Sequence, residues 1–149
     1  MRYGKNKKGL TLVEVLIAAS ILAITLLGVV AMFPSAYENV KYGGRISRAT
    51  ALAREMLETL RNEPFAILAS YHTLDTSACG AETDPIATTC QKWRDDIDTV
   101  GLPSGTGSVA ICIAPCTATN DLAQITVTVG WSERTGAKTV QLVTYAAQF

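Results

Sequence analysis

The feature that most constrains this chain is an apolar run of about 24 residues, from Leu10 to Phe33, with a single charged side chain, Glu14. A helix of this length can cross a hydrocarbon core of about 30 Å. A carboxylate within such a helix costs up to about 3 kcal/mol and is retained where a cation meets it. No Lys, Arg or His lies between Leu10 and Lys41. We therefore expect the partner of Glu14 to come from another chain or from a new N-terminus.

A basic stretch, Lys5-Asn6-Lys7-Lys8-Gly9, directly precedes the apolar run. Because basic flanks stay in the cytoplasm, we expect a single-pass N-in, C-out topology with everything after Phe33 outside. A cleaved secretory signal would have a shorter apolar region, of about 7 to 15 residues, followed by a small-residue cleavage site. The candidate site Pro34-Ser35-Ala36 is poor because it contains proline. The run is therefore interpreted as a membrane anchor.

The combination of Gly9 at the boundary and Glu14 five positions later resembles the type IV prepilin family. The matching residues are Lys7-Lys8-Gly9 and then Leu10-Thr11-Leu12-Val13-Glu14-Val15-Leu16-Ile17. The resemblance implies that prepilin peptidase cleaves between Gly9 and Leu10 and that the new amine of Leu10 is methylated. Glu14 would then pair with the amine of its own or a neighbouring subunit, because opposite charges attract strongly at low dielectric.

The helical pattern continues beyond the anchor. Apolar residues recur at spacings of three and four, as on one face of a helix, at Ile46, Ala49, Ala53, Met56, Leu57 and Leu60. Pro34 should kink or loosen this helix, Gly43-Gly44 should weaken it, and Asn62-Glu63-Pro64 should end it. We expect a leader over 1–9, a transmembrane or filament-core helix over 10–33, its continuation over 34–62, and a globular domain over 63–149.

The C-terminal part of the chain alternates between apolar and polar residues, as a half-buried strand does. The pattern covers Ile125 to Trp131 and Val140 to Thr144, with Gly136 in the turn between them. We predict a C-terminal hairpin, a third strand at Ser108 to Ala114, and a short helix near Lys92 to Asp98 within an otherwise loop-rich segment. The fold class is α+β: a long N-terminal α-helix packed by its second half on a small antiparallel β-sheet domain, as in pilins.

All four cysteines, Cys79, Cys90, Cys112 and Cys116, lie on the outward side of the anchor. An even count in a small exported domain predicts two disulfides. Three pairings are possible, and proximity favours Cys79 with Cys90 and Cys112 with Cys116. A zinc site is the alternative, but the chain has no Cys-x-x-Cys pair and only one histidine, His72. We expect no metal and no cofactor.

Residues that could carry other chemistry are few. The leader holds four of the 13 basic residues, so its removal leaves nine against 13 acidic residues; this mild acidity argues against a nucleic-acid partner. Calcium could bind acidic side chains, but these lack EF-hand spacing and are interpreted as solvated: Asp84, Asp95, Asp96, Asp98 and Asp121. We interpret His72, near Ser70 and Asp75, as an exposed or loop histidine, and Trp93 and Trp131 as packing residues. No enzyme motif is present.

We therefore expect a structural subunit, not an enzyme. Its ending, Trp131-Ser132-Glu133-Arg134-Thr135-Gly136 and Val140 to Tyr145, is similar to V-type minor pilins and to I-type minor pseudopilins of type II secretion. The resemblance implies a precursor in the bacterial inner membrane, which later joins other pilin or pseudopilin subunits in a pilus or pseudopilus with its globular domain extracytoplasmic. Such subunits prime assembly or sit at the tip, and an exposed hairpin edge could be completed by a partner. A major pilin and a membrane-anchored enzyme or sensor remain alternatives.

Overall fold

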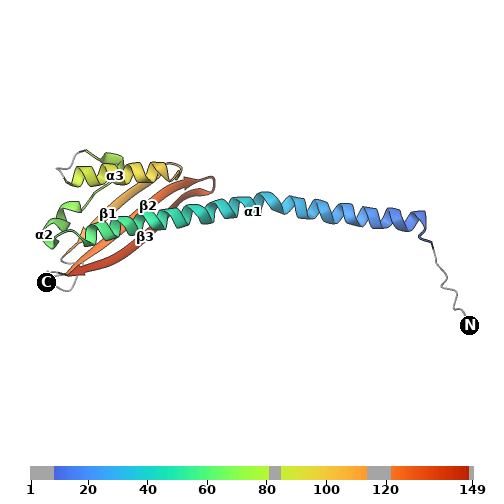
Figure 1. The fold of residues 1–149 in the computed structure, drawn as a ribbon, viewed down its shortest axis with the longest axis horizontal. Coiled ribbons are helices and arrows are strands. Elements are labelled where there is room, and N and C mark those ends of the chain that lie inside the picture. Colours follow the sequence, from blue (N-terminus) through green and yellow to red (C-terminus); the bar gives the residue numbers. More distant parts are fainter. Residues whose placement is uncertain (1–8, 81–84, 114–121, 148–149) are drawn as a thin grey trace, which may run out of the picture. The chain divides into compact units, whose positions relative to one another are not determined.

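The computed structural model describes residues 9–80, 85–113 and 122–147 of the 149-residue chain. Its elements are α1 (Leu12–Arg61), α2 (Phe65–Leu68), α3 (Ile86–Thr99), β1 (Thr106–Cys112), β2 (Leu122–Glu133) and β3 (Gly136–Ala147), with 3-10 turns η1 (Ala69–Tyr71) and η2 (Thr76–Ala78). A long N-terminal helix followed by a small antiparallel sheet confirms the predicted α+β class (Figure 1). The chain forms two compact units, Met1–Tyr42 and Gly43–Phe149.

The first unit contains the N-terminal part of α1. Every described residue from Gly9 to Tyr42 is exposed, including most of the large apolar side chains of the predicted anchor. Pro34 lies inside the helix and does not end it. No residue of this stretch of helix is therefore buried by the described part of the chain.

In the second unit, the C-terminal part of α1 packs into the core through one face. The predicted apolar stripe is confirmed: its buried members are Ala49, Ala53, Met56 and Leu60, joined by Leu52, while Ile46 and Leu57 are half-buried beside them. The helix ends at Arg61, just before the predicted stop. The amide of Asn62 still donates to the carbonyl of Glu58 at 3.2 Å.

The sheet has the order β1-β2-β3, with both pairs antiparallel. Along β2 every second side chain, from Ala123 to Trp131, is buried. The buried faces of α1 and α3 belong to the same core, so both helices cover one face of the sheet. The predicted hairpin is confirmed, and Gly136 directly after its turn has φ 113°, a conformation that glycine adopts without steric cost.

The helix expected near Lys92 to Asp98 is longer than predicted, because α3 already begins at Ile86. Its buried residues are Ile86, Cys90, Trp93 and Ile97, a helical spacing that includes a cysteine. The third strand, expected to start at Ser108, starts at Thr106 and ends at Cys112. The predicted end of this strand, Ala114, lies outside the described residues.

Replacement of Gly107 by Ala should destabilise the globular unit by about 1 to 3 kcal/mol, because a Cβ there would overpack the core. Such a Cβ would lie 2.5 Å from the ring of Trp93. Gly44→Ala is the matched control, since a Cβ at this helical position meets nothing within 4 Å and should raise helix stability by up to about 1 kcal/mol. Thermal unfolding of the detergent-solubilised chain measures both, and an unchanged melting temperature for Gly107→Ala would contradict the packing argument.

Candidate assembly site at the N-terminus

The peptide bond between Gly9 and Leu10 lies just before α1, outside any helix or strand. Neither residue is helical, and Leu10 is 73% exposed. A Cβ placed on Gly9 would meet no atom of the chain within 4 Å. The fold of this chain therefore leaves the bond accessible and does not itself require glycine at position 9.

Thr11 caps the first turn of α1. Its hydroxyl Oγ1 accepts a hydrogen bond from the amide of Glu14 at 3.3 Å, and its carbonyl accepts from the amides of Glu14 and Val15 at 3.1 and 3.2 Å. A threonine followed three residues later by glutamate is the sequence pattern of a capping box. The sequence interpretation missed this role of Thr11, although the pattern is legible there. The cap fixes the start of the helix at Leu12, three residues after Gly9.

Glu14 lies in the first turn of α1 and is exposed. The N-terminal end of a helix carries partial positive charge, which favours a carboxylate there. Among the described residues, Glu14 takes part in none of the ion pairs. It borders an open, mostly apolar hollow on one face of the helix, lined by Thr11, Val13, Glu14, Ile17, Ala18 and Ile21. The site thus presents an unpaired carboxylate beside apolar surface.

The helix that follows is long and apolar enough to cross a membrane, and none of that stretch is buried by the chain. Contiguous exposed apolar surface of this size marks a membrane or protein interaction site. The N-terminal region therefore combines an accessible peptide bond, a capped helix start, one carboxylate and a lipid-compatible surface.

The globular unit ties the second part of α1 to the hairpin turn through Glu133. Its carboxylate pairs with the guanidinium of Arg45 and accepts from the indole nitrogen of Trp131 at 2.9 Å. The hydrogen bonds from Arg45 and Trp131, followed by the positive charges of Arg45 and Lys138, hold the pKa of Glu133 below its usual value. These contacts stabilise the ionised form of the carboxyl group in the folded state.

A pH dependence of stability follows from the lowered pKa of Glu133. The folded state binds this proton less readily than the unfolded state, so the stabilisation is complete above the ordinary glutamate pKa of about 4.3 and is lost as the pH falls below it. In Glu133→Gln, the drop in melting temperature between about pH 5 and pH 3 should be shallower than in the parent chain. Glu58→Gln, at a carboxylate that is 68% exposed, is the control. Identical acid profiles for the Glu133→Gln and parent chains would contradict the assignment.

Two of the four cysteines are joined directly in the described part of the chain. Cys79 and Cys90 form a disulfide whose Cα atoms lie 5.6 Å apart, and it ties the segment after η2 to α3. Cys112 is also disulfide-bonded, and the partner expected for it, Cys116, lies outside the described residues. The cross-link at Cys90 fixes the first turns of α3 against the neighbouring loop.

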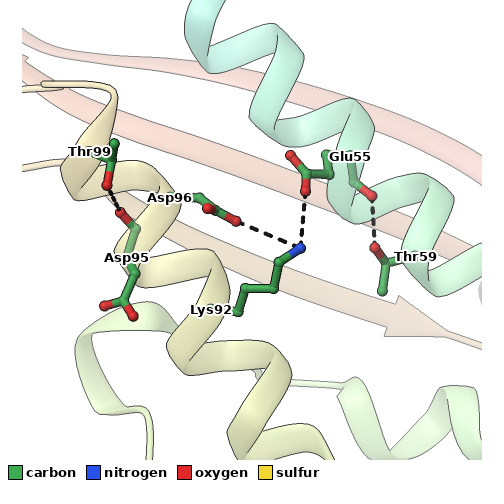
Figure 2. A network of polar contacts seen from close by, with 6 residues as sticks. All are labelled: Glu55, Thr59, Lys92, Asp95, Asp96 and Thr99. Carbon is green, nitrogen blue, oxygen red and sulfur yellow. Dashed lines mark hydrogen bonds and ion pairs between the residues drawn. The ribbon is translucent and has the colours of Figure 1, made fainter.

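Figure 2 shows Lys92 of α3 between two carboxylates, those of Glu55 and Asp96. The ammonium of Lys92 lies 3.2 Å from a carboxylate oxygen of Glu55 on α1 and 4.0 Å from one of Asp96, beside a small surface cleft that also includes Trp93. Asp95 and Asp98 are exposed, whereas Asp84 and Asp121 lie outside the described residues. In the described ranges, no three side chains of the metal-binding types gather. The described carboxylates of α3 therefore lie at the surface, and Asp96 shares Lys92 with Glu55 of α1.

His72 and Asp75, which lie close together in the sequence, each accept hydrogen bonds from other residues. His72 is exposed, and its Nδ1 accepts from the amide of Ile111 at 3.1 Å. The carboxylate of Asp75 accepts from the amide and the hydroxyl of Ser77 at 2.8 and 2.7 Å. Trp93 and Trp131 are each only 3% exposed, as packing residues are. His72 therefore holds the edge of β1, and Asp75 caps the turn η2.

Comparison with known proteins gives one family match. Residues 4–30 match the model of the prokaryotic N-terminal methylation motif. No curated protein and no solved structure gives a match to this chain. The matched residues include the Gly9–Leu10 bond, the cap at Thr11, the carboxylate of Glu14 and most of the apolar run.

Proposed function

Since its residues 4–30 carry the prokaryotic N-terminal methylation motif, this chain is a type IV prepilin-like protein, and we propose that it is a minor subunit of a type IV pilus. Such a chain acts as a structural subunit and not as an enzyme. It enters the membrane as a precursor, loses residues 1–9 to prepilin peptidase, is methylated on Leu10, and joins other pilins through α1. The observation that carries the proposal is the placement of an accessible Gly9–Leu10 bond directly before a capped helix that holds Glu14 in its first turn.

The first support is the position of the proposed cleavage bond. Gly9 and Leu10 both precede the helix, so the bond between them is not held in helical geometry. Thr11, which follows the Gly9–Leu10 bond in the chain, caps the helix. Cleavage therefore leaves a free amine one residue before the helix cap, close to the turn that contains Glu14.

The second support is that Glu14 pairs with no cation among the residues that the structure describes. Cleavage would create an ammonium at Leu10, four residues before this carboxylate. In a bundle of apolar helices the attraction between the two groups is strong because few polar groups and little water screen it. Pairing with the amine of a neighbouring subunit would place two helices in one defined register, since only one depth satisfies both charges.

The third support is the exposed apolar surface of α1 up to Tyr42. Lipid can cover this surface in the precursor, and other apolar helices can cover it in a filament. Small residues such as Ala18, Ala19 and Ala23 would permit close approach of those helices. The same surface would thus be covered by lipid in the membrane precursor and by neighbouring helices in the filament.

Mass spectrometry of the chain purified from membranes and from sheared filaments tests the proposal. We expect loss of residues 1–9 and one added methyl group on Leu10, with the mature chain present in filaments at low abundance relative to the main subunit. An intact leader in both fractions would refute the prepilin assignment. A processed chain absent from sheared filaments would instead favour a secretion pseudopilus, and high abundance there would favour a major pilin.

A further inference from the structure

The two edge strands of the sheet, β1 and β3, differ in whether the rest of the fold accepts their outward hydrogen bonds. Along β1, the amides that point away from β2 all have acceptors. Gly107 donates to the hydroxyl of Thr76 at 2.8 Å, Val109 to the carbonyl of Leu74 at 2.9 Å, and Ile111 to His72 at 3.1 Å. The segment from His72 to Thr76 therefore closes the β1 edge, so a further strand cannot pair there without displacing it.

The hydrogen-bond alternation identifies which groups of β3 face outward. Val109 turns its amide away from β2, so its pair with Val127 is a non-hydrogen-bonded one. Val127 must then bond to its other partner, Leu142. The residues of β3 that alternate with Leu142 turn their amides and carbonyls to the free edge: Thr139, Gln141, Val143 and Tyr145. In the part of the chain that the structure describes, none of these four makes a hydrogen bond on that side.

The β3 edge also lacks the usual protection against strand pairing. Edge strands are normally guarded by charged residues, proline or bulges. From Thr139 to Ala147 there is no charged residue, proline or glycine, and the register with β2 runs one to one without a bulge. Val143 is 49% and Tyr145 56% exposed on the outer face. The edge is long, uncharged and partly apolar.

We propose that β3 is the docking site for an extended, uncharged strand of a different prepilin-like subunit, which adds a fourth strand to the sheet. The proposal rests on the proposed function as a filament subunit. The incoming strand would satisfy the outward amides and carbonyls of β3. On one face it would place apolar side chains beside Val143 and Tyr145, and on the other beside half-buried Val140 and Leu142.

A second copy of this chain fits the site less well than a different subunit does. Its β1 edge is closed, so of the strand edges that the structure describes it could offer only its own β3. Antiparallel pairing of two identical strands is two-fold symmetric and closes at two copies. A filament instead requires head-to-tail contacts between successive subunits, which a strand from a different subunit can provide.

Photo-crosslinking in intact cells tests the proposal on the full-length chain. Tyr145 is replaced by p-benzoylphenylalanine, and the adduct is identified by mass spectrometry. We expect the partner to be a different chain that itself carries a processed, methylated N-terminus. Val143→Lys should lower the adduct yield by at least about tenfold, because it places a charge against the incoming strand. Gln141→Pro should act similarly, since it removes an outward amide while leaving the bonds to β2 intact.

Ala110→Lys is the matched control. Ala110 and Val143 both pair with Thr126 and therefore lie in one row of the outer face, but Ala110 lies on the closed β1 strand. This variant should keep the parent adduct yield. An adduct with a second copy of the chain, no adduct at all, or a yield insensitive to both β3 variants would overturn the proposal. The N-terminal peptide of the same sample separates the two hypotheses: a processed chain without adduct refutes only the docking site, whereas an uncut leader refutes the proposed function.

Discussion

A chain with Val in place of Gly9 is expected to remain in the membrane at full precursor length, with processing reduced on the order of 100-fold or more. Glycine has no Cβ and permits close approach of another backbone, which a peptidase cutting after Gly9 would require. The chain itself has no such requirement, because a Cβ at Gly9 meets nothing within 4 Å. The loss would therefore report recognition by the peptidase and not misfolding.

Gly4→Val is the matched control for this experiment, since it makes the same change within the same leader but away from the junction. Gel mobility and the mass of the N-terminal peptide distinguish precursor from mature chain. The control should be processed as the parent chain is. Normal processing of Gly9→Val would show that the cut lies elsewhere.

The second large effect is expected for Glu14→Gln, which should insert and lose its leader normally but be depleted from filaments by about 100-fold. Loss of one partner of a charge pair in a low-dielectric setting costs about 3 kcal/mol or more, which corresponds to that ratio. Gln has nearly the same size as Glu, and the backbone amide of residue 14 can still donate to the hydroxyl of Thr11. The variant thus removes the charge and leaves the helix cap in place.

Glu38→Gln is the control for charge, because Glu38 is the next carboxylate along α1 and is also exposed. It should enter filaments at the parent level. Immunoblots of sheared filaments and membranes, normalised to the mature chain, give the ratio for each variant. Equal incorporation of Glu14→Gln and the parent chain would refute the pairing role of Glu14.

Much of the fold follows from short-range patterns in the sequence. The buried face of α1 from Ala49 to Leu60 is a helical repeat, and the end of α1 at Arg61 agrees with the proline at position 64. The hairpin is predictable because β2 buries every second residue and Gly136 supplies the positive φ after the turn. These elements depend on residues close together in sequence.

The parts that were missed depend on contacts between distant residues or on small polar groups. The full extent of α3 was hidden because Cys90 was assigned to a disulfide and not also to the apolar face of a helix. The closure of the β1 edge by Thr76, Leu74 and His72 joins residues more than 30 positions apart. The spacing of apolar residues along the sequence does not predict such long-range hydrogen bonds. Thr11 differs, because its capping pattern is local and was available in the sequence.

The cap at Thr11 has a consequence for how the precursor is converted into the subunit. The start of the helix is already set by residues on the mature side of the Gly9–Leu10 bond. Cleavage would therefore exchange a leader with four basic residues for a single ammonium without any refolding of α1. In the precursor, α1 would already have the fold that it keeps in the filament. Cleavage would then prepare the chain for assembly by changing its N-terminal charge and not its shape.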